Sequence, residues 1–197
     1  MTSSSSIDEA KRLLRIEMLE RRRALNPDER ADGAAAIAAS GLGFVEPAAG
    51  AVISGYSAIR DELDPALLLA GLASAGHPLA LPVTVARGKA LLFRCWEAGA
   101  SLERGDFSVP VPGENASVVV PGILLVPLLA FDLQGYRLGY GAGYYDRTLA
   151  QLRSDGVITA IGLAFDVQQV ENVPRDGYDE PLDWVLTPSG PKKIGRV

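Results

Sequence analysis

The sequence predicts an α/β fold, a three-layer sandwich in which helices cover both faces of a mainly parallel central sheet. Two observations lead to this prediction. Candidate strands and helices alternate along the chain, and candidate strands such as 123–129 and 158–163 are almost continuously apolar, as strands buried on both faces must be. With 197 residues, 48% of them hydrophobic, the chain can bury one substantial core, so we expect a single domain over residues 1–197.

The first 40 residues predict a helical N-terminal arm packed on that domain. The segment Ser6–Glu9 has the pattern of a capping box, and it opens a helical run that continues to about Leu25. The segment Asn26–Glu29 combines an N-cap, a first-turn proline and a returning acid, and it opens a second helix that continues to Ser40. The apolar residues of the first helix form only a narrow stripe, enough to dock it on the remainder of the chain.

The rest of the chain alternates between apolar runs of strand length and helical segments. The expected strands cover residues 51–56, 79–83, 90–96, 118–126, 157–165 and 184–187. The expected helices cover residues 64–75 and 144–154. Ligands of open parallel sheets bind beyond the carboxyl ends of the strands, so the loops after Tyr56, Phe131 and Phe165 are the expected places for a site.

Composition excludes several classes of protein. A net charge of −5 and a pI near 5.0 argue against a general surface for nucleic acid or anionic membranes, which requires an excess of lysine and arginine. Cys95 and His77 are the only residues of their kinds, which excludes an internal disulfide, a structural zinc site and catalysis by a Ser/His/Asp or Cys/His set. The polar N-terminus and the lack of a long apolar run predict no signal peptide and no membrane span. We therefore expect a cytoplasmic monomer or small homo-oligomer.

A glycine-rich loop at residues 137–146 follows an apolar strand and leads into a helix. Glycines let backbone amides approach an anion, and a helix N-terminus adds a positive partial charge, so the loop has the form of a phosphate cradle. A Walker A loop needs a lysine followed by serine or threonine, which this loop lacks. A dinucleotide loop needs glycine where Tyr144 stands, although Asp166 lies where a ribose-binding acid is expected. These residues alone leave a phosphate loop, a dinucleotide loop and a plain tight turn open.

Charged residues accompany the loop. Asp146 stands in the first turn of the expected helix, where the helix dipole favours a carboxylate even without a function. Lys11, Arg15 and Arg22 are spaced by four and seven residues, which places them on one face of the first helix. A polyphosphate can lie against that face, and a merely solvated helix face is the other interpretation.

The wider run Arg-Leu-Gly-x-Gly-x-Gly-Tyr-Tyr-Asp-Arg at residues 137–147 resembles the signature of the 5-formyltetrahydrofolate cyclo-ligase family. Three other regions resemble that family in the same order along the chain: residues 11–15, with the pattern Lys-x-x-Leu-Arg, the acidic loop at 61–64, and a C-terminal segment from 161 to 187. The resemblance thus covers nearly the whole chain.

The resemblance implies a reaction. Its substrate is a reduced folate with a formyl group on N5, its co-substrate is ATP and its metal is Mg²⁺. ATP phosphorylates the formyl oxygen so that N10 can attack the carbon, and 5,10-methenyltetrahydrofolate, ADP and phosphate are the products. Amides, basic side chains and Mg²⁺ are what stabilise the charge of such a transfer.

The resemblance also implies roles for individual residues. The implied nucleotide contacts are Lys11, Arg12, Leu13, Leu14, Arg15, Arg137, Leu138, Gly139, Tyr140, Gly141, Ala142, Gly143, Tyr144 and Tyr145. The implied folate contacts are Ser57, Glu62, Phe107, Tyr140, Gly141, Ala142, Gly143 and Tyr144. The implied catalytic residues are Arg137 and Tyr144, and the implied magnesium ligands are Asp146 and Asp179.

Three positions depart from the family pattern: Tyr140 and Ala142 replace glycine or a basic residue, and Tyr178 stands where histidine is common. Two other functions stay open at this point. One is an oxidoreductase that holds a dinucleotide with its glycine-rich loop and Asp166. The other is a non-catalytic relative that binds folate or nucleotide.

Overall fold

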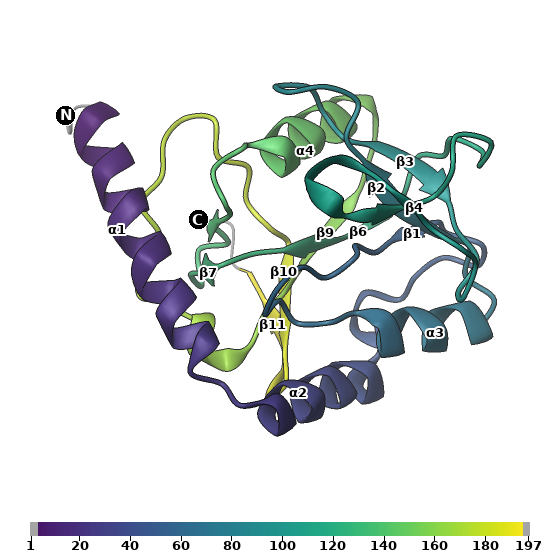
Figure 1. The fold of residues 1–197 in the computed structure, drawn as a ribbon, viewed down its shortest axis with the longest axis horizontal. Helices are drawn as coiled ribbons and strands as arrows, with labels where there is room; N and C mark the ends of the chain where they lie inside the picture. Colours follow the sequence, from purple (N-terminus) through teal and green to yellow (C-terminus); the bar gives the residue numbers. More distant parts are fainter. Residues whose placement is uncertain (1–3, 195–197) are drawn as a thin grey trace.

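The structure is a computed structural model that describes residues 4–194, and its centre is a seven-stranded sheet (Figure 1). The strand order is β11-β10-β9-β6-β1-β2-β3. Its strands are β1 Ile53–Ser54, β2 Leu79–Val83, β3 Leu92–Cys95, β6 Ile123–Pro127, β9 Thr159–Leu163, β10 Trp184–Thr187 and β11 Gly190–Lys193. Only the edge strands β3 and β11 pair in the antiparallel sense. The mainly parallel sheet predicted from the sequence is confirmed.

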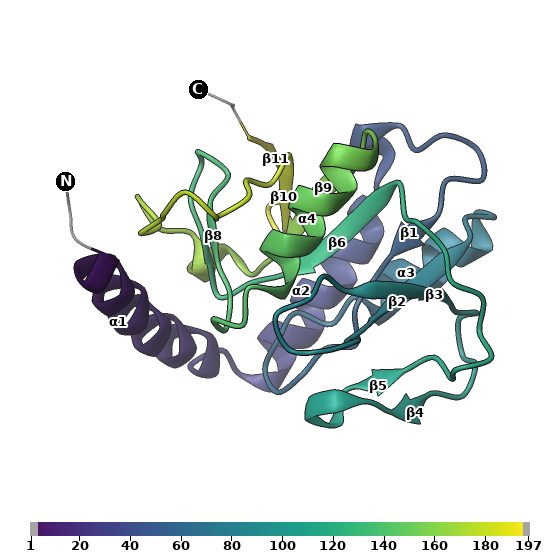
Figure 2. The ribbon, with the colours of Figure 1, turned by 90° about the horizontal axis from the view of Figure 1, so that it is seen from above.

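Helices cover both faces of this sheet (Figures 1 and 2). The helices are α1 Ser4–Arg23, α2 Pro27–Ser40, α3 Ala66–Ser74 and α4 Tyr144–Asp155, and the short 3-10 helices are η1 Gly43–Val45, η2 Asp106–Ser108 and η3 Asp166–Gln168. Alternate residues of β6 point to opposite sides: Leu125 packs in the core with α2 and α3, whereas Leu124 and Val126 pack in the core with Leu149 of α4. This arrangement is the expected three-layer sandwich.

Two short antiparallel pairs lie outside the main sheet, and the sequence did not predict them. They are β4 Glu103–Arg104 with β5 Pro110–Val111, and β7 Ala130–Phe131 with β8 Arg137–Leu138. Strands of two residues are too short for an apolar alternation to be visible. The second pair sets the position of Arg137 and Leu138 at the start of the glycine-rich loop.

The helix starts differ in how well the sequence located them. The cap of α2 is confirmed: the Glu29 amide donates to Asn26 Oδ1 at 2.9 Å, and the Asn26 amide donates to Glu29 Oε2 at 2.7 Å. The predicted cap at Ser6 is wrong, because α1 already includes Ser4 and Ser6 therefore lies inside the helix. A capping pattern within a long helical run cannot by itself show that the helix begins there.

Helix α1 lies away from the main sheet, and its inner face packs on the β7–β8 pair (Figure 2). Met18 is fully buried in a cluster with Leu129, Ala130, Leu138 and Val173. The narrow apolar stripe of this helix is therefore part of the core. Within residues 4–194, none of the helices combines the length and the apolar character that crossing a bilayer requires.

Candidate functional site

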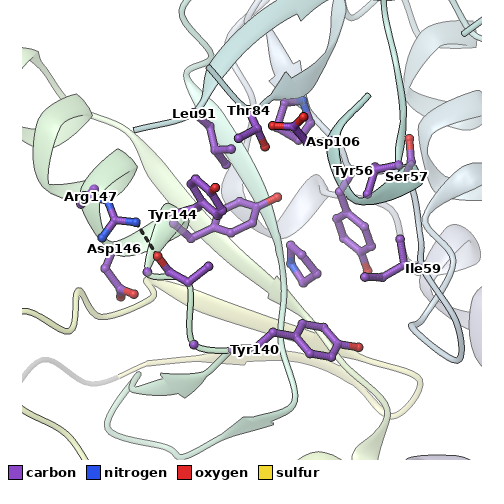
Figure 3. A pocket seen from close by; sticks show the side chains of 18 of the residues that line it. Tyr56, Ser57, Ile59, Thr84, Leu91, Asp106, Tyr140, Tyr144, Asp146 and Arg147 are labelled. Atoms are coloured by element: carbon purple, nitrogen blue, oxygen red, sulfur yellow. Dashed lines mark hydrogen bonds between the residues drawn. The ribbon is translucent and has the colours of Figure 1, made fainter. Parts of the chain in front are cut away.

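A cavity of about 1590 Å³ opens beyond the carboxyl ends of β1, β2 and β6 (Figure 3). Its walls are the loop after β1, the β4–β5 pair, the glycine-rich loop with the start of α4, one face of α1, and residues 176–180. In Figure 3, Tyr144, Asp146 and Arg147 lie on one side of the cavity, and Tyr56, Ser57 and Ile59 lie on the other. The expected site lies at this edge of the sheet, although Asp166 in the loop after Phe165 is not among the lining residues.

The glycine-rich loop has a shape that side chains would disturb. Gly141 has a φ of 102°, and a Cβ there would lie 3.3 Å from the guanidinium of Arg15, which donates from Nε to Gly139 O at 2.9 Å. Gly143 is the left-handed N-cap of α4, and a Cβ there would lie 2.9 Å from Arg147 Nη1. The amides of the first turn of α4 have no partner within the helix and are directed at the N-terminal end. The loop therefore offers backbone donors and two guanidinium groups to an anion.

Arg147 adds an unused donor to this loop. Its guanidinium donates to Ala142 O (dashed line in Figure 3) and lies 5.6 Å from the ring centre of Tyr144. Its Nε atom is buried, and no hydrogen-bond partner for it exists among the described residues. A buried donor without an acceptor is costly to the folded state.

The two candidate magnesium ligands each hold a basic side chain at the edge of the cavity. Asp146 Oδ1 accepts from Arg137 Nη2 at 2.7 Å and from the Glu180 amide at 3.2 Å. Asp179 Oδ2 accepts from Lys11 Nζ at 2.6 Å. Since Glu180 follows Asp179 directly, the two carboxylates are held by one connected set of contacts. Within the described residues, no group of three or more acidic, histidine or cysteine side chains is placed to hold a metal ion.

Burial and charge set the protonation of these basic groups. Arg137 is buried, which lowers the pKa of its guanidinium, while the charge of Asp146 opposes that shift. Burial also acts to lower the pKa of Lys11, but hydrogen bonds to Asp179 and Asp176 outweigh it, so the pKa of this ammonium is raised. The raised pKa keeps Lys11 a cation at neutral pH, and the buried guanidinium of Arg137 has Asp146 as its counter-charge.

The opposite end of the cavity holds a buried acid. Glu62 is 8% exposed, and its Oε2 accepts from the Ile59 amide at 2.9 Å. Burial raises the pKa of its carboxyl. Ser57 lies beside it in the loop after β1 and donates from Oγ to Pro110 O at 2.7 Å, which ties the β4–β5 pair to this end. Phe107 belongs to η2 in the same hairpin, and its side chain lies outside the described residues.

The structure brings most of the predicted site residues to one cavity. Those that line it are Lys11, Arg15, Ser57, Glu62, Arg137, Leu138, Gly139, Tyr140, Gly141, Ala142, Gly143, Tyr144, Tyr145, Asp146 and Asp179. It does not bring Arg12, Leu13 or Leu14 there: Arg12 pairs with Glu9, Leu13 is exposed, and Leu14 packs against the buried cluster around Met18. These three neighbours of Lys11 point elsewhere because successive residues of a helix are about 100° apart.

Among the lining residues that were not assigned a role from the sequence are Arg147 and Asp176. Arg147 is the last residue of the glycine-rich run at 137–147 and lies about one helical turn after Tyr144. This spacing could have indicated that Arg147 faces the same cavity. Asp176 Oδ2 lies 2.9 Å from Lys11 Nζ, so Asp176 and Asp179 pair with the same lysine. A spacing of three residues within a loop gives no comparable signal in the sequence. The pKa of Asp176 is lowered by its hydrogen bond from Lys11.

Fewer basic residues of α1 line the cavity than their helical spacing predicted. Lys11 and Arg15 line it, but Arg22 does not. Eleven residues of helix separate Lys11 from Arg22 by roughly 16 Å, which carries Arg22 beyond the cavity. Its guanidinium is buried against Asp61 and Tyr140 instead.

Replacing Glu62 by Gln is expected to leave the melting temperature at pH 7 unchanged or higher. A carboxyl group whose pKa is raised by folding stabilises the folded state most at pH values below its ordinary pKa of 4.5. That stabilisation is lost as the pH rises through the raised pKa. The wild type therefore loses stability in that window, and the amide variant does not. Thermal unfolding from pH 4 to 8 measures the difference, with the exposed Glu97→Gln as control. If Glu62→Gln melted below the wild type at pH 7 but not at pH 4, the result would contradict this prediction.

Comparisons with known proteins agree on one family. The profile of the 5-formyltetrahydrofolate cyclo-ligase family matches residues 7–188. A 5-formyltetrahydrofolate cyclo-ligase of Escherichia coli K12 is 32% identical over 176 residues, which cover 86% of this chain and 96% of that protein. The mouse cyclo-ligase is 25% identical over 94% of this chain and 97% of its own length.

Solved structures show the same fold. The 5,10-methenyltetrahydrofolate synthetase of Aquifex aeolicus superposes with a TM-score of 0.75 at 27% identity, over 95% of each chain. The synthetase of Mycoplasma pneumoniae superposes with a TM-score of 0.71 at 23% identity, over 90% of this chain and 98% of that one. The fold, the glycine-rich loop and the matched length lead to one conclusion: the chain belongs to the 5-formyltetrahydrofolate cyclo-ligase family.

Proposed function

We propose that this chain catalyses the ATP- and Mg²⁺-dependent cyclisation of 5-formyltetrahydrofolate to 5,10-methenyltetrahydrofolate, with release of ADP and phosphate. One observation carries the proposal: a single cavity has a glycine-rich anion loop at one end and the buried carboxylate of Glu62 at the other. The first end suits a triphosphate and the second suits the donor groups of a pterin ring. The family relationship supports the same pairing of ligands.

The phosphate end combines amides with fixed cations. Arg15 is held on the loop by Gly139 O, and Arg147 is held there by Ala142 O. Arg137 enters from β8, anchored by Asp146 and by the Glu180 carbonyl. Preorganised donors of this kind stabilise the charge that spreads over a phosphoryl group during transfer without having to reorganise.

The carboxylates of Asp146 and Asp179 fit a magnesium ion. Mg²⁺ commonly takes one or two carboxylates and completes its octahedron with water and phosphate oxygens. When bound, it neutralises phosphate charge. Lys11 and Arg137, which hold these acids in the structure, are themselves suited to phosphate oxygens.

The folate end positions the reacting groups. Glu62 accepts hydrogen bonds from the ring, with Ser57 beside it in the same loop, so that the formyl group on N5 faces the loop. The terminal phosphoryl group of ATP moves to the formyl oxygen and ADP departs. N10 then attacks the formyl carbon, the bond from that carbon to the phosphorylated oxygen breaks, and the N10 proton is released. Arg137 and Tyr144 line the cavity and stabilise the transferred group.

All of these groups come from one chain, so a monomer or small homo-oligomer can act alone. The free Cys95 fits a reducing cytoplasm. The alternative of a dinucleotide enzyme has no support in the cavity, because Asp166 accepts from Thr187 Oγ1 at 2.7 Å and from the Ser189 amide at 3.2 Å.

A coupled assay tests the proposal. With 5-formyltetrahydrofolate, ATP and Mg²⁺, we expect one ADP for each methenyl product, followed by absorbance and by an ADP-coupled reaction. Full-rate product without ATP would overturn the coupling. Binding of both ligands without turnover would assign the chain to the non-catalytic alternative, and stabilisation by NAD(P) rather than by ATP would assign it to the oxidoreductase alternative.

A further inference from the structure

We propose that Arg22 is a positioning residue for the folate end of the cavity, where it holds Tyr140 of the glycine-rich loop against the turn that carries Glu62. The inference rests on the proposed function in naming 5-formyltetrahydrofolate as the ligand of that end. It assigns to helix α1 a second task besides supplying Lys11 and Arg15 to the phosphate end.

Arg22 has the contacts of a fixed group. It is 1% exposed and lies on the inner face of α1. Its Nε and Nη2 donate to Asp61 Oδ2 and Oδ1 at 3.2 and 3.3 Å, its Nη2 donates to Tyr140 OH at 2.6 Å, and its Nη1 donates to Leu128 O at 3.5 Å. One guanidinium thus joins three segments that are distant in the sequence. A planar fork with five donors can do this, and an ammonium group cannot.

Asp61 connects this fork to Glu62. Burial acts to raise the pKa of Asp61, but the hydrogen bond and charge of Arg22 outweigh it, and the pKa is lowered. The carboxylate therefore stays ionised and paired at neutral pH. On the other side of the turn, the Tyr56 hydroxyl donates to Leu63 O at 2.6 Å. Glu62 is held between these two anchors.

Tyr140 connects helix α1 to the glycine-rich loop beside Glu62. Its hydroxyl accepts from Arg22 Nη2 at 2.6 Å. The ring centre of Tyr140 lies 5.9 Å from the guanidinium of Arg22 and 5.8 Å from that of Arg60. Burial raises the pKa of Glu62, and the Ile59 amide, the charge of Arg22 and the nearby Tyr140 oppose that rise. The charged and titratable groups near Glu62 include Arg22, Asp61, Tyr140, Tyr56 and Tyr145.

This arrangement has a functional consequence. Glu62 Oε2 accepts from the Ile59 amide, and Arg22 holds both Asp61, the residue before Glu62, and the hydroxyl of Tyr140. A ligand that donates to Glu62 therefore meets an acceptor whose direction depends on α1. If Arg22 were only a core ion pair, its replacement would change stability and leave ligand binding unaltered.

Three variants separate these roles. Arg22→Lys keeps the charge beside Asp61 but loses the fork, Tyr140→Phe removes only the hydroxyl, and Arg21→Lys makes the same change on the exposed neighbour that pairs with Glu17. We expect Arg22→Lys to raise the KM for folate about tenfold and Tyr140→Phe about threefold, with the KM for ATP changed less than about twofold in both. Because they act through one another, the double variant should match Arg22→Lys alone. Arg21→Lys should change none of these values.

Each result decides for or against the inference. Wild-type folate constants in both single variants, or multiplied effects in the double variant, would overturn it, as would a loss that falls on ATP alone. If Arg22→Lys does not fold, Tyr140→Phe decides, because its side chain is partly exposed and only an oxygen is removed. If the wild type shows no turnover, the proposed function fails, and calorimetry with 5-formyltetrahydrofolate on the same variants still tests the inference.

Discussion

The Asp146→Asn variant is expected to lose about 10²-fold or more in kcat and to need a higher Mg²⁺ concentration for its half-maximal rate. Removing a preorganised electrostatic group at a centre of phosphoryl transfer costs on the order of 10²-fold or more. The amide is nearly isosteric but lacks the charge that a hard cation requires. The acid also anchors Arg137 at 2.7 Å, so that guanidinium loses its counter-charge as well.

Magnesium titrations separate these two causes. A shift in the Mg²⁺ optimum identifies a metal ligand, whereas an equal rate loss at every Mg²⁺ concentration identifies a residue that only orients Arg137. Asp179→Asn should behave in the same way, since its partner Lys11 reaches it from α1 at 2.6 Å. The matched control is Asp155→Asn, which makes the same change on an exposed residue at the far end of α4. Unchanged kinetics in both Asp146→Asn and Asp179→Asn would return these acids to a capping and ion-pairing role.

Deleting the residues before Asn26 is expected to abolish binding of both ligands and to lower the melting temperature by roughly 10 °C or more. Losing a buried side chain of the size of Met18 costs about 2–5 kcal/mol, and 1 kcal/mol shifts the melting temperature of a chain of this size by about 2–4 °C. The deletion also leaves Asp61 without Arg22, and it uncovers Leu138 at the base of the glycine-rich loop. The narrow apolar stripe read from the sequence, taken alone, instead predicts that the rest of the chain folds and binds folate without this helix.

Circular dichroism and calorimetry on the truncated chain measure these losses. Removing only residues 1–3 serves as the control and should leave both ligand constants and the melting temperature unchanged. A truncated chain that melts like the wild type and binds 5-formyltetrahydrofolate normally would contradict the role given to α1. It would also contradict the link through Arg22, so the two proposals can be tested together.

Elements with a strong local signal were predicted well. The bounds of β2 and β10 agree with their apolar runs, and the start of α4 agrees with the end of the glycine-rich loop. The expected strand at 51–56 is shorter, because β1 covers only Ile53–Ser54 before the chain turns into the cavity wall. A Cβ on Gly55 would lie 2.5 Å from Leu69 Cδ1, so close packing of α3, which hydropathy does not report, governs this place.

The sequence by itself determined the alternation that makes a parallel sheet, the capped start of α2, the glycine-rich loop before α4 and the family to which the chain is similar. These features depend on backbone freedom, hydrogen bonds between near neighbours and runs of apolar side chains, all of which are local. Only the tertiary structure decided that Lys11 meets Asp179, 168 residues away, and that Arg22 does not line the cavity but pairs with Asp61 and with Tyr140 of its lining. Helical spacing shows which residues share a face, but the packing of Met18 against distant segments sets where along that face the cavity ends.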